Sequence, residues 1–133
     1  MFEYFPDNYA WSLTAAPLFD EVGTISEPEE ALREVRHLAG ADKAVANEAW
    51  HESFIKLAEK LERLGSIDLN EGHPLTAARK LHRSGLYFLR AERFLHHDDS
   101  RKLRTYLRGI KNFRMARELA KEPVEYIDVP YKE

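Results

Sequence analysis

Histidines and carboxylates fall close together at two places in the sequence. Glu48 and His51 are three residues apart, which puts a carboxylate and an imidazole on one face of a helix, as in di-iron bundles. Such a centre needs a second Glu-x-x-His pair, and Glu92 and His96 are four apart. We therefore expect Glu48 and His51 to be surface residues beside Trp50. We predict no metal site and no other cofactor.

The run His96-His97-Asp98-Asp99 is the second concentration of possible ligands. Adjacent histidines near a helix end point in different directions, and the helix dipole favours histidine at that end. We interpret the run as the end of one helix followed by an aspartate that caps the next.

The sequence lacks the motifs that usually supply a catalytic nucleophile. The sequence has no cysteine, which excludes thiol nucleophiles, thiolate zinc sites and disulfides, and it has no Gly-x-Ser-x-Gly elbow. A serine triad also needs an oxyanion hole at a strand-to-helix turn, which an all-helical chain does not offer. We predict no catalytic residue, and we expect the chain alone to hydrolyse nothing.

A basic face is predicted near the C-terminus, since Arg101, Arg104, Arg108 and Lys111 recur at helical spacing. An anion, an RNA backbone or an acidic partner could bind there. However, there is no nucleic-acid motif, and the net charge of −3 gives no overall attraction to nucleic acid. Pairing with the acidic segment 27–34 accounts for the same charges, so we predict no nucleic-acid partner.

Aromatic and polar side chains give the most suggestive candidates for ligand binding. Most aromatic residues must form the core, but tyrosine and tryptophan have polar ends that can orient a ligand. The predicted substrate-binding residues are Tyr9, Trp11, His82, Tyr87 and Arg90. For His82 and Arg90, a buried hydrogen-bonded pair is the alternative.

Helices should position these residues, because apolar side chains recur at steps of three and four along most of the chain. The first expected helix begins after Asp7 or Asn8 and has Pro17 in its middle, and the second runs from Ser26 to Gly40. The third carries Trp50 to Leu64 and stops at a Gly65 C-cap. The fourth runs from Pro74 to about Leu95, and the fifth runs from Ser100 to about Ala120. Loop 66–73 joins the third to the fourth. Their short loops predict antiparallel hairpins, so the fold class is all-α, a bundle of about five helices.

Apolar residues also predict which side of each late helix is buried. The fourth helix should bury a stripe that begins at Leu75. For the fifth helix the expected buried side is Leu103, Tyr106, Leu107, Ile110, Phe113 and Ala116.

The segment 124–131 changes character, because its valine, isoleucine and tyrosine residues favour a β-strand. A single strand cannot satisfy its own backbone donors and acceptors, so it must join a sheet. We expect residues 1–122 to form a helical domain and residues 123–133 to begin a following domain that this chain lacks.

Three motifs resemble one group of α/β-hydrolases, the first two in its helical N-terminal region and the last in the first strand of its hydrolase domain. They are the opening FEYFPDNYAW, the stretch from Arg83 to Leu95 followed by Asp99-Ser100-Arg101, and Val129-Pro130-Tyr131. The group includes 2,6-dihydroxypseudooxynicotine hydrolase and the fungal pigment hydrolases that shorten polyketide chains; its members have Asp-Pro-Arg where this chain has Asp99-Ser100-Arg101.

The resemblance implies a lid and substrate-binding domain of a serine hydrolase that cleaves a carbon–carbon or ester bond next to a carbonyl. Its partners would be the α/β-hydrolase domain, in cis or as a separate chain, and a small aromatic or polyketide-like substrate. A detached lid exposes an apolar face, so a homo-oligomer such as a dimer is also expected.

Two broader expectations complete the prediction. No run approaches the roughly 20 apolar residues that span a bilayer, so we expect no membrane association and a cytoplasmic protein. The alternative function is a tetratricopeptide-like interaction module, loosely suggested by Trp50, Ala58, Tyr87 and Ala91. Such repeats recur about every 34 residues, whereas the segment after Asp99 does not repeat the Trp50 pattern, which argues against this alternative.

Overall fold

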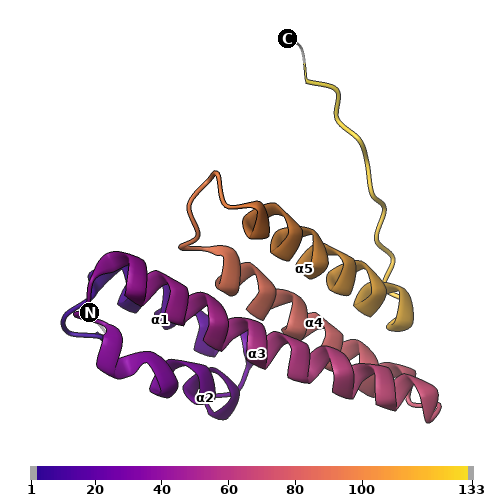
Figure 1. The fold of residues 1–133 in the computed structure, drawn as a ribbon. Coiled ribbons are helices and arrows are strands. Elements are labelled where there is room, and N and C mark those ends of the chain that lie inside the picture. The colour runs from indigo at the N-terminus through magenta and orange to yellow at the C-terminus, as the bar shows by residue number, and fades with distance from the viewer. Residues whose placement is uncertain (1–2, 132–133) are drawn as a thin grey trace.

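The computed structural model describes residues 3–131 and confirms an all-α fold with five α-helices (Figure 1). Within that range there is no β-strand. None of the helices it describes combines the length and the apolar character that crossing a bilayer requires. The helical elements are α1 (Tyr9–Val22), α2 (Ser26–Val35), the 3₁₀-helix η1 (Arg36–Leu38), α3 (Lys43–Asn70), α4 (Pro74–Glu92) and α5 (Ser100–Leu119).

Three long helices form the body of the molecule. The chain reverses between α3 and α4 and again between α4 and α5, so α4 lies between two neighbours that run the opposite way (Figure 1). α2 packs on α3, and α1 contacts α2 and α4. The antiparallel hairpins predicted from the short loops are therefore present.

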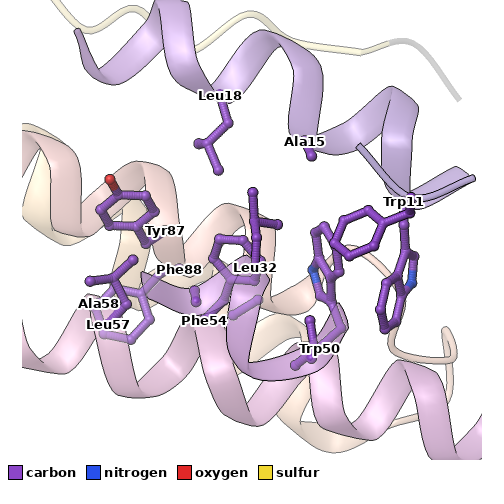
Figure 2. Close-up of a cluster of buried hydrophobic side chains, with 14 of the residues drawn as sticks. Trp11, Ala15, Leu18, Leu32, Trp50, Phe54, Leu57, Ala58, Tyr87 and Phe88 are labelled. Carbon is purple, nitrogen blue, oxygen red and sulfur yellow. The ribbon is translucent and has the colours of Figure 1, made fainter. Parts of the chain in front are cut away.

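A chain of aromatic rings fills the core between α1, α3 and α4. Trp11 and Trp50 lie 4.9 Å apart between ring centroids, Phe5 lies 5.1 Å from Trp11, and Phe54 lies 4.7 Å from Trp50 (Figure 2). All four side chains are buried. Burying aromatic area on this scale is the main stabilising contribution that a helical domain without disulfides can make.

The N-terminal segment is tied to α1 by hydrogen bonds as well as by packing. The Asn8 side chain caps α1 by accepting from the Trp11 backbone N–H at 3.0 Å, as predicted. The Ser12 hydroxyl accepts from the Phe5 N–H at 2.8 Å and donates to the Phe5 carbonyl at 3.0 Å. α1 runs without interruption through Pro17 and ends at Gly23, whose φ is +66°.

The predicted end of the third helix at Gly65 is wrong, and so is the predicted loop 66–73. α3 continues to Asn70, and Gly72, with φ +84°, takes the left-handed conformation in the turn to α4. Gly65 is buried, and a Cβ added to it would lie 3.1 Å from the Leu81 Cγ. This glycine therefore allows α3 and α4 to approach closely and does not end a helix.

The second helix is shorter than predicted. It ends at Val35, and η1 replaces the expected continuation to Gly40. Ser26 is the first helical residue, while Ile25 takes the cap position without a side-chain hydrogen bond. Glu29, three residues after Ser26, accepts a hydrogen bond from the Tyr4 hydroxyl and lies 3.8 Å from the Arg36 guanidinium.

α4 and α5 meet where a glycine of one faces a glycine of the other. A Cβ on Gly85 would lie 3.0 Å from the Gly109 carbonyl oxygen, and a Cβ on Gly109 would lie 3.1 Å from the Gly85 carbonyl oxygen. The two backbones are therefore almost in contact. The α5 side that faces α4 buries Thr105, Gly109, Asn112 and Ala116.

A line of polar groups runs through the same contact and reaches α3. The Ser84 hydroxyl donates to the Ala58 carbonyl at 2.7 Å and accepts from the Asn112 side-chain amide at 3.0 Å. That amide also donates to Glu62 at 3.1 Å, and Arg108 bonds the same carboxylate. Satisfied buried hydrogen bonds of this kind fix the rotation of α5 about its axis.

This arrangement overturns half of the predicted buried side of the fifth helix, although Ala116 is buried as expected. Leu103, Tyr106 and Leu107 are 64%, 43% and 54% exposed. Small residues allow a closer approach of α5 to α4 than leucines would, so the apolar side chains point away from the bundle. Leu75, expected at the start of the buried stripe of α4, is likewise exposed.

Residues 121–131 follow α5 as an exposed segment without regular structure. The segment leaves the end of α5 on the side away from α4 (Figure 1). Its β-strand character remains a prediction.

Replacing Gly109 by alanine should destabilise the protein by about 1–3 kcal/mol, because the new methyl group meets a backbone carbonyl and the Phe88 Cβ. Urea unfolding measures the change. Helix propensity alone predicts the opposite sign, a gain of about 1 kcal/mol.

Lys111→Ala on the exposed side of α5 is the control and should leave the free energy of unfolding nearly unchanged. A Gly109→Ala protein that is as stable as the wild type contradicts the close contact.

Candidate functional site

A groove between α1, α4 and α5 is the candidate site. Its volume is about 440 Å³. It lies where the C-terminal ends of α1 and α5 flank the first half of α4, and both apolar and charged side chains line it. The lining residues are Glu21, Val22, Leu75, Ala78, Arg79, His82, Arg83, Ala116, Ala120 and Glu122.

His82 is the predicted site residue that lines this groove. Its ring packs edge-on against Phe113, with 5.1 Å between ring centroids. Burial lowers the pKa of His82 below its usual 6.5, and the positive charge of Arg117 lowers it further. A neutral imidazole at the wall of a groove can accept or donate a hydrogen bond to a ligand.

Next to the groove, Tyr87 and Arg83 hold one carboxylate. Arg83 donates to Glu27 through two nitrogens, at 2.9 and 3.1 Å, and the Tyr87 hydroxyl donates to the same carboxylate at 3.2 Å. The Tyr87 side chain is fully buried. Burial and the nearby Glu27 charge raise the pKa of Tyr87 far above its usual range, so the hydroxyl stays protonated.

Arg90 lies one turn beyond Tyr87 on α4 and binds Glu21, a groove residue at the end of α1. Its backbone carbonyl accepts a hydrogen bond from the Trp50 indole N–H at 2.8 Å. The Arg90 Nε is buried and has no hydrogen-bond partner among the described residues. His82 and Arg90 have separate partners, so they do not form the buried pair considered as the alternative.

Tyr9 and Trp11 lie elsewhere. Tyr9 opens α1 and is 63% exposed, about 18 Å along the helix from Glu21 at 1.5 Å per residue. Trp11 is part of the aromatic core. The structure therefore brings His82, Tyr87 and Arg90 to one region through shared neighbours, but it does not bring all five predicted residues together.

Sequence reasoning missed the acidic partners in this region, Glu21 and Glu27. Arg83 and Tyr87 are four residues apart on one helix face, which indicates that they can share a ligand. Their acid is 56 residues from Arg83 along the chain, so no local pattern could identify it.

Glu48 and His51, the Glu-x-x-His pair, bind two different partners. Glu48 binds Arg101 through both oxygens, at 2.6 and 2.8 Å, and these hydrogen bonds lower the pKa of Glu48. His51, predicted to be a surface residue, is instead buried, and its Nδ1 lies 2.9 Å from the Ala91 carbonyl. The reason is that α3 packs this face against the end of α4.

His96, His97 and Asp98 present donor atoms within 4.8 Å of one another. All three side chains are exposed and come from consecutive residues of one loop. Three exposed ligands with no buried supporting shell suit a weak surface chelate and not an enclosed metal centre. Asp99, as predicted, caps the next helix by accepting from the Arg101 N–H at 2.9 Å.

The basic face of α5 pairs with α3 and not with the acidic segment 27–34. Arg101 binds Glu48, and Arg108 binds Glu59 at 2.7 Å together with Glu62. The predicted pairing is wrong because α2 packs on α3 while α5 packs on α4. The carboxylates of segment 27–34 bind Arg36, Arg83, Lys56 and Lys60 instead.

Comparison of the chain with protein-family models, with curated proteins and with solved structures gave no match in any of the three.

Lowering the pH should destabilise the protein through His82. Because the folded state lowers the pKa of this imidazole, the unfolded chain binds its proton more readily, and stability falls as the pH decreases through 6.5. We expect His82→Gln to reduce this loss, measured as the free energy of unfolding at several pH values. The control is His37→Gln at an exposed position. An unchanged pH profile in His82→Gln contradicts the prediction.

Tyr87→Phe should cost about 1 kcal/mol, since it removes a hydrogen bond to Glu27 and leaves the buried ring in place. A double-mutant cycle with Glu27→Gln in urea unfolding measures the coupling between the two side chains. Tyr126→Phe in the exposed segment serves as the control and should change nothing. Zero coupling between positions 27 and 87 speaks against the hydrogen bond.

Proposed function

We propose that this chain is the N-terminal lid and substrate-binding domain of a serine α/β-hydrolase that acts on a carbon–carbon or ester bond next to a carbonyl. The observation that carries the proposal is the segment 121–131, whose β-forming side chains lie exposed outside the bundle. Such a segment gains stability by joining the sheet of another domain. The resemblance of its Val129-Pro130-Tyr131 to a hydrolase first strand supports the same conclusion.

The groove supports the substrate-binding part of the proposal. Its lining includes the end of α5 and Glu122, where the exposed segment begins, so a domain attached there would border the groove. A neutral His82 and the apolar Leu75 and Val22 suit a small aromatic or polyketide-like ligand. A helical cap over such a site excludes water and shapes the pocket, while the catalytic serine, acid and histidine come from the hydrolase domain.

No observation in the structure favours the tetratricopeptide-like alternative. The three longest helices have 28, 19 and 20 residues, whereas tandem repeats stack helix pairs of similar size. We further propose a cytoplasmic location, the absence of nucleic-acid and membrane partners, and, for the isolated domain at high concentration only, weak self-association through its exposed apolar side chains.

A fluorophosphonate probe tests the hydrolase assignment, because it reacts covalently with activated serines. An antibody raised against this chain recovers the native protein from the cells that make it. We expect the recovered polypeptide, or one bound tightly to it, to be labelled, and we expect the purified 133-residue chain alone to remain unlabelled. The control is probe labelling after heat denaturation, which removes the activated serine.

Absence of labelling in the recovered material overturns the proposal. Labelling of a serine within residues 1–133 overturns it equally, because the chemistry would then belong to this domain.

A further inference from the structure

α5 carries a row of three apolar residues and one arginine on the side away from α4. Leu103, Leu107, Ile110 and Arg114 follow one another at steps of four, three and four, opposite to Thr105, Gly109 and Asn112, which face α4. We call Leu103, Leu107, Ile110 and Arg114 the outer stripe. Leu103 and Leu107 are more than half exposed, and Tyr106 beside them is 43% exposed. Neighbouring large apolar side chains exposed on one helix face indicate a binding surface.

The outer stripe is not flat. At its N-terminal end, a hollow of about 310 Å³ is lined by Leu103, Tyr106, His97, Glu92 and Lys102. Such a depression between a leucine and a tyrosine can receive an apolar side chain from another surface.

Positive charge borders the stripe. Arg104 and Lys111 are exposed beside it, and neither forms an ion pair with any residue that the structure describes. Arg114 lies within the stripe, where its guanidinium carbon is 4.7 Å from the centroid of the Tyr126 ring. A surface that covers the stripe must therefore be apolar at its centre and acidic at its edge.

The Arg114–Tyr126 contact also fixes where the exposed segment starts. It holds residue 126 over the C-terminal end of the stripe, while Ile127 and Val129 beyond it are 74% and 83% exposed. In Figure 1 the segment runs outward from the end of α5 on the side opposite α4, which is also the side of the stripe, so a sheet that pairs with residues 124–131 can cover the stripe as well. One body can satisfy both surfaces.

We infer that a single β-sheet domain covers the outer stripe of α5 and takes residues 124–131 as one of its strands, with acidic residues of that domain facing Arg104 and Lys111. This inference rests on the proposed function, and it identifies the domain as the hydrolase sheet. The strand supplies backbone hydrogen bonds, and the stripe supplies apolar contact.

A second copy of this chain suits the stripe less well. A symmetric dimer would place the same stripe on both sides of the contact, so Arg104, Lys111 and Arg114 of one copy would face those of the other. Like charges opposed in this way repel. Such a dimer would also leave residues 124–131 of both copies without a sheet.

Photo-crosslinking from single positions tests the inference in the native protein. A photoreactive phenylalanine analogue replaces Leu107, Ile127 or, as a control, Lys56 on the exposed side of α3, in the gene at its own locus in the cells that make the protein. Crosslinked peptides are then identified by mass spectrometry. We expect Leu107 and Ile127 to crosslink to one domain, with the Ile127 product on a β-strand, and we expect Lys56 to give no such product.

A second measurement uses the absence of cysteine in the chain. Leu107→Cys and Ile127→Cys should react with maleimide at least about tenfold more slowly in the native protein than in the isolated chain, because the partner covers them. Lys56→Cys should react equally in both. All three positions are exposed on the isolated domain, and the Lys56–Glu34 ion pair lies at the surface, so its melting temperature should change little.

The inference is overturned if Leu107 and Ile127 crosslink to different domains, if Leu107 crosslinks to a second copy of this chain, or if both cysteines stay as reactive as in the isolated chain. A β-sheet domain that covers both positions but does not react with fluorophosphonate supports the docking surface and overturns the hydrolase function. A fluorophosphonate-reactive polypeptide with Leu107 uncovered does the reverse.

Discussion

The close approach of α4 and α5 at Gly85 and Gly109 determines the character of the whole molecule. Either glycine, given a Cβ, would meet the carbonyl oxygen of the other at 3.0–3.1 Å, so a larger residue on either side would force the two helices apart by a few tenths of an ångström. With the backbones this near, the buried side of α5 must consist of small and polar residues. Leu103 and Leu107 are thereby directed outward. One side of α5 packs against α4, and the opposite side exposes apolar residues that a partner can contact.

The aromatic core and the polar contact between α4 and α5 stabilise the protein in different ways. Trp11, Trp50 and Phe54 join α1 to α3 by apolar burial, whose strength depends on area and not on direction. Ser84 and Asn112 join α4 to α5 by directional hydrogen bonds, which specify rotation more than they add net stability. These hydrogen bonds act together with the glycine contact in fixing the rotation of α5 and therefore the outward direction of the outer stripe.

Much of the fold follows from local patterns in the sequence, but the side of α5 that is buried does not. Helix caps such as Asn8 and Asp99, and the proline that opens α4, act within one turn and could be predicted. For α5, two faces compete, one with leucines and one with Thr105 and Gly109. Hydrophobicity favours the first, and only the position of Gly85 on the neighbouring helix reveals that the second is buried. Glu21 and Glu27, the acidic partners in the candidate site, lie far from Arg90 and Arg83 in the sequence. Local patterns could not identify these pairs either.

Packing of the two tryptophans also gives the protein an optical signature. The two indoles lie 4.9 Å apart and are tilted by 49°, and the sequence contains no third tryptophan. Transition dipoles at this separation and angle couple, so circular dichroism of the folded chain should contain an exciton couplet that depends on both rings at once. Since Trp11 belongs to α1 and Trp50 to α3, the couplet reports whether the N-terminal helix is seated on the rest of the bundle, independently of helix content.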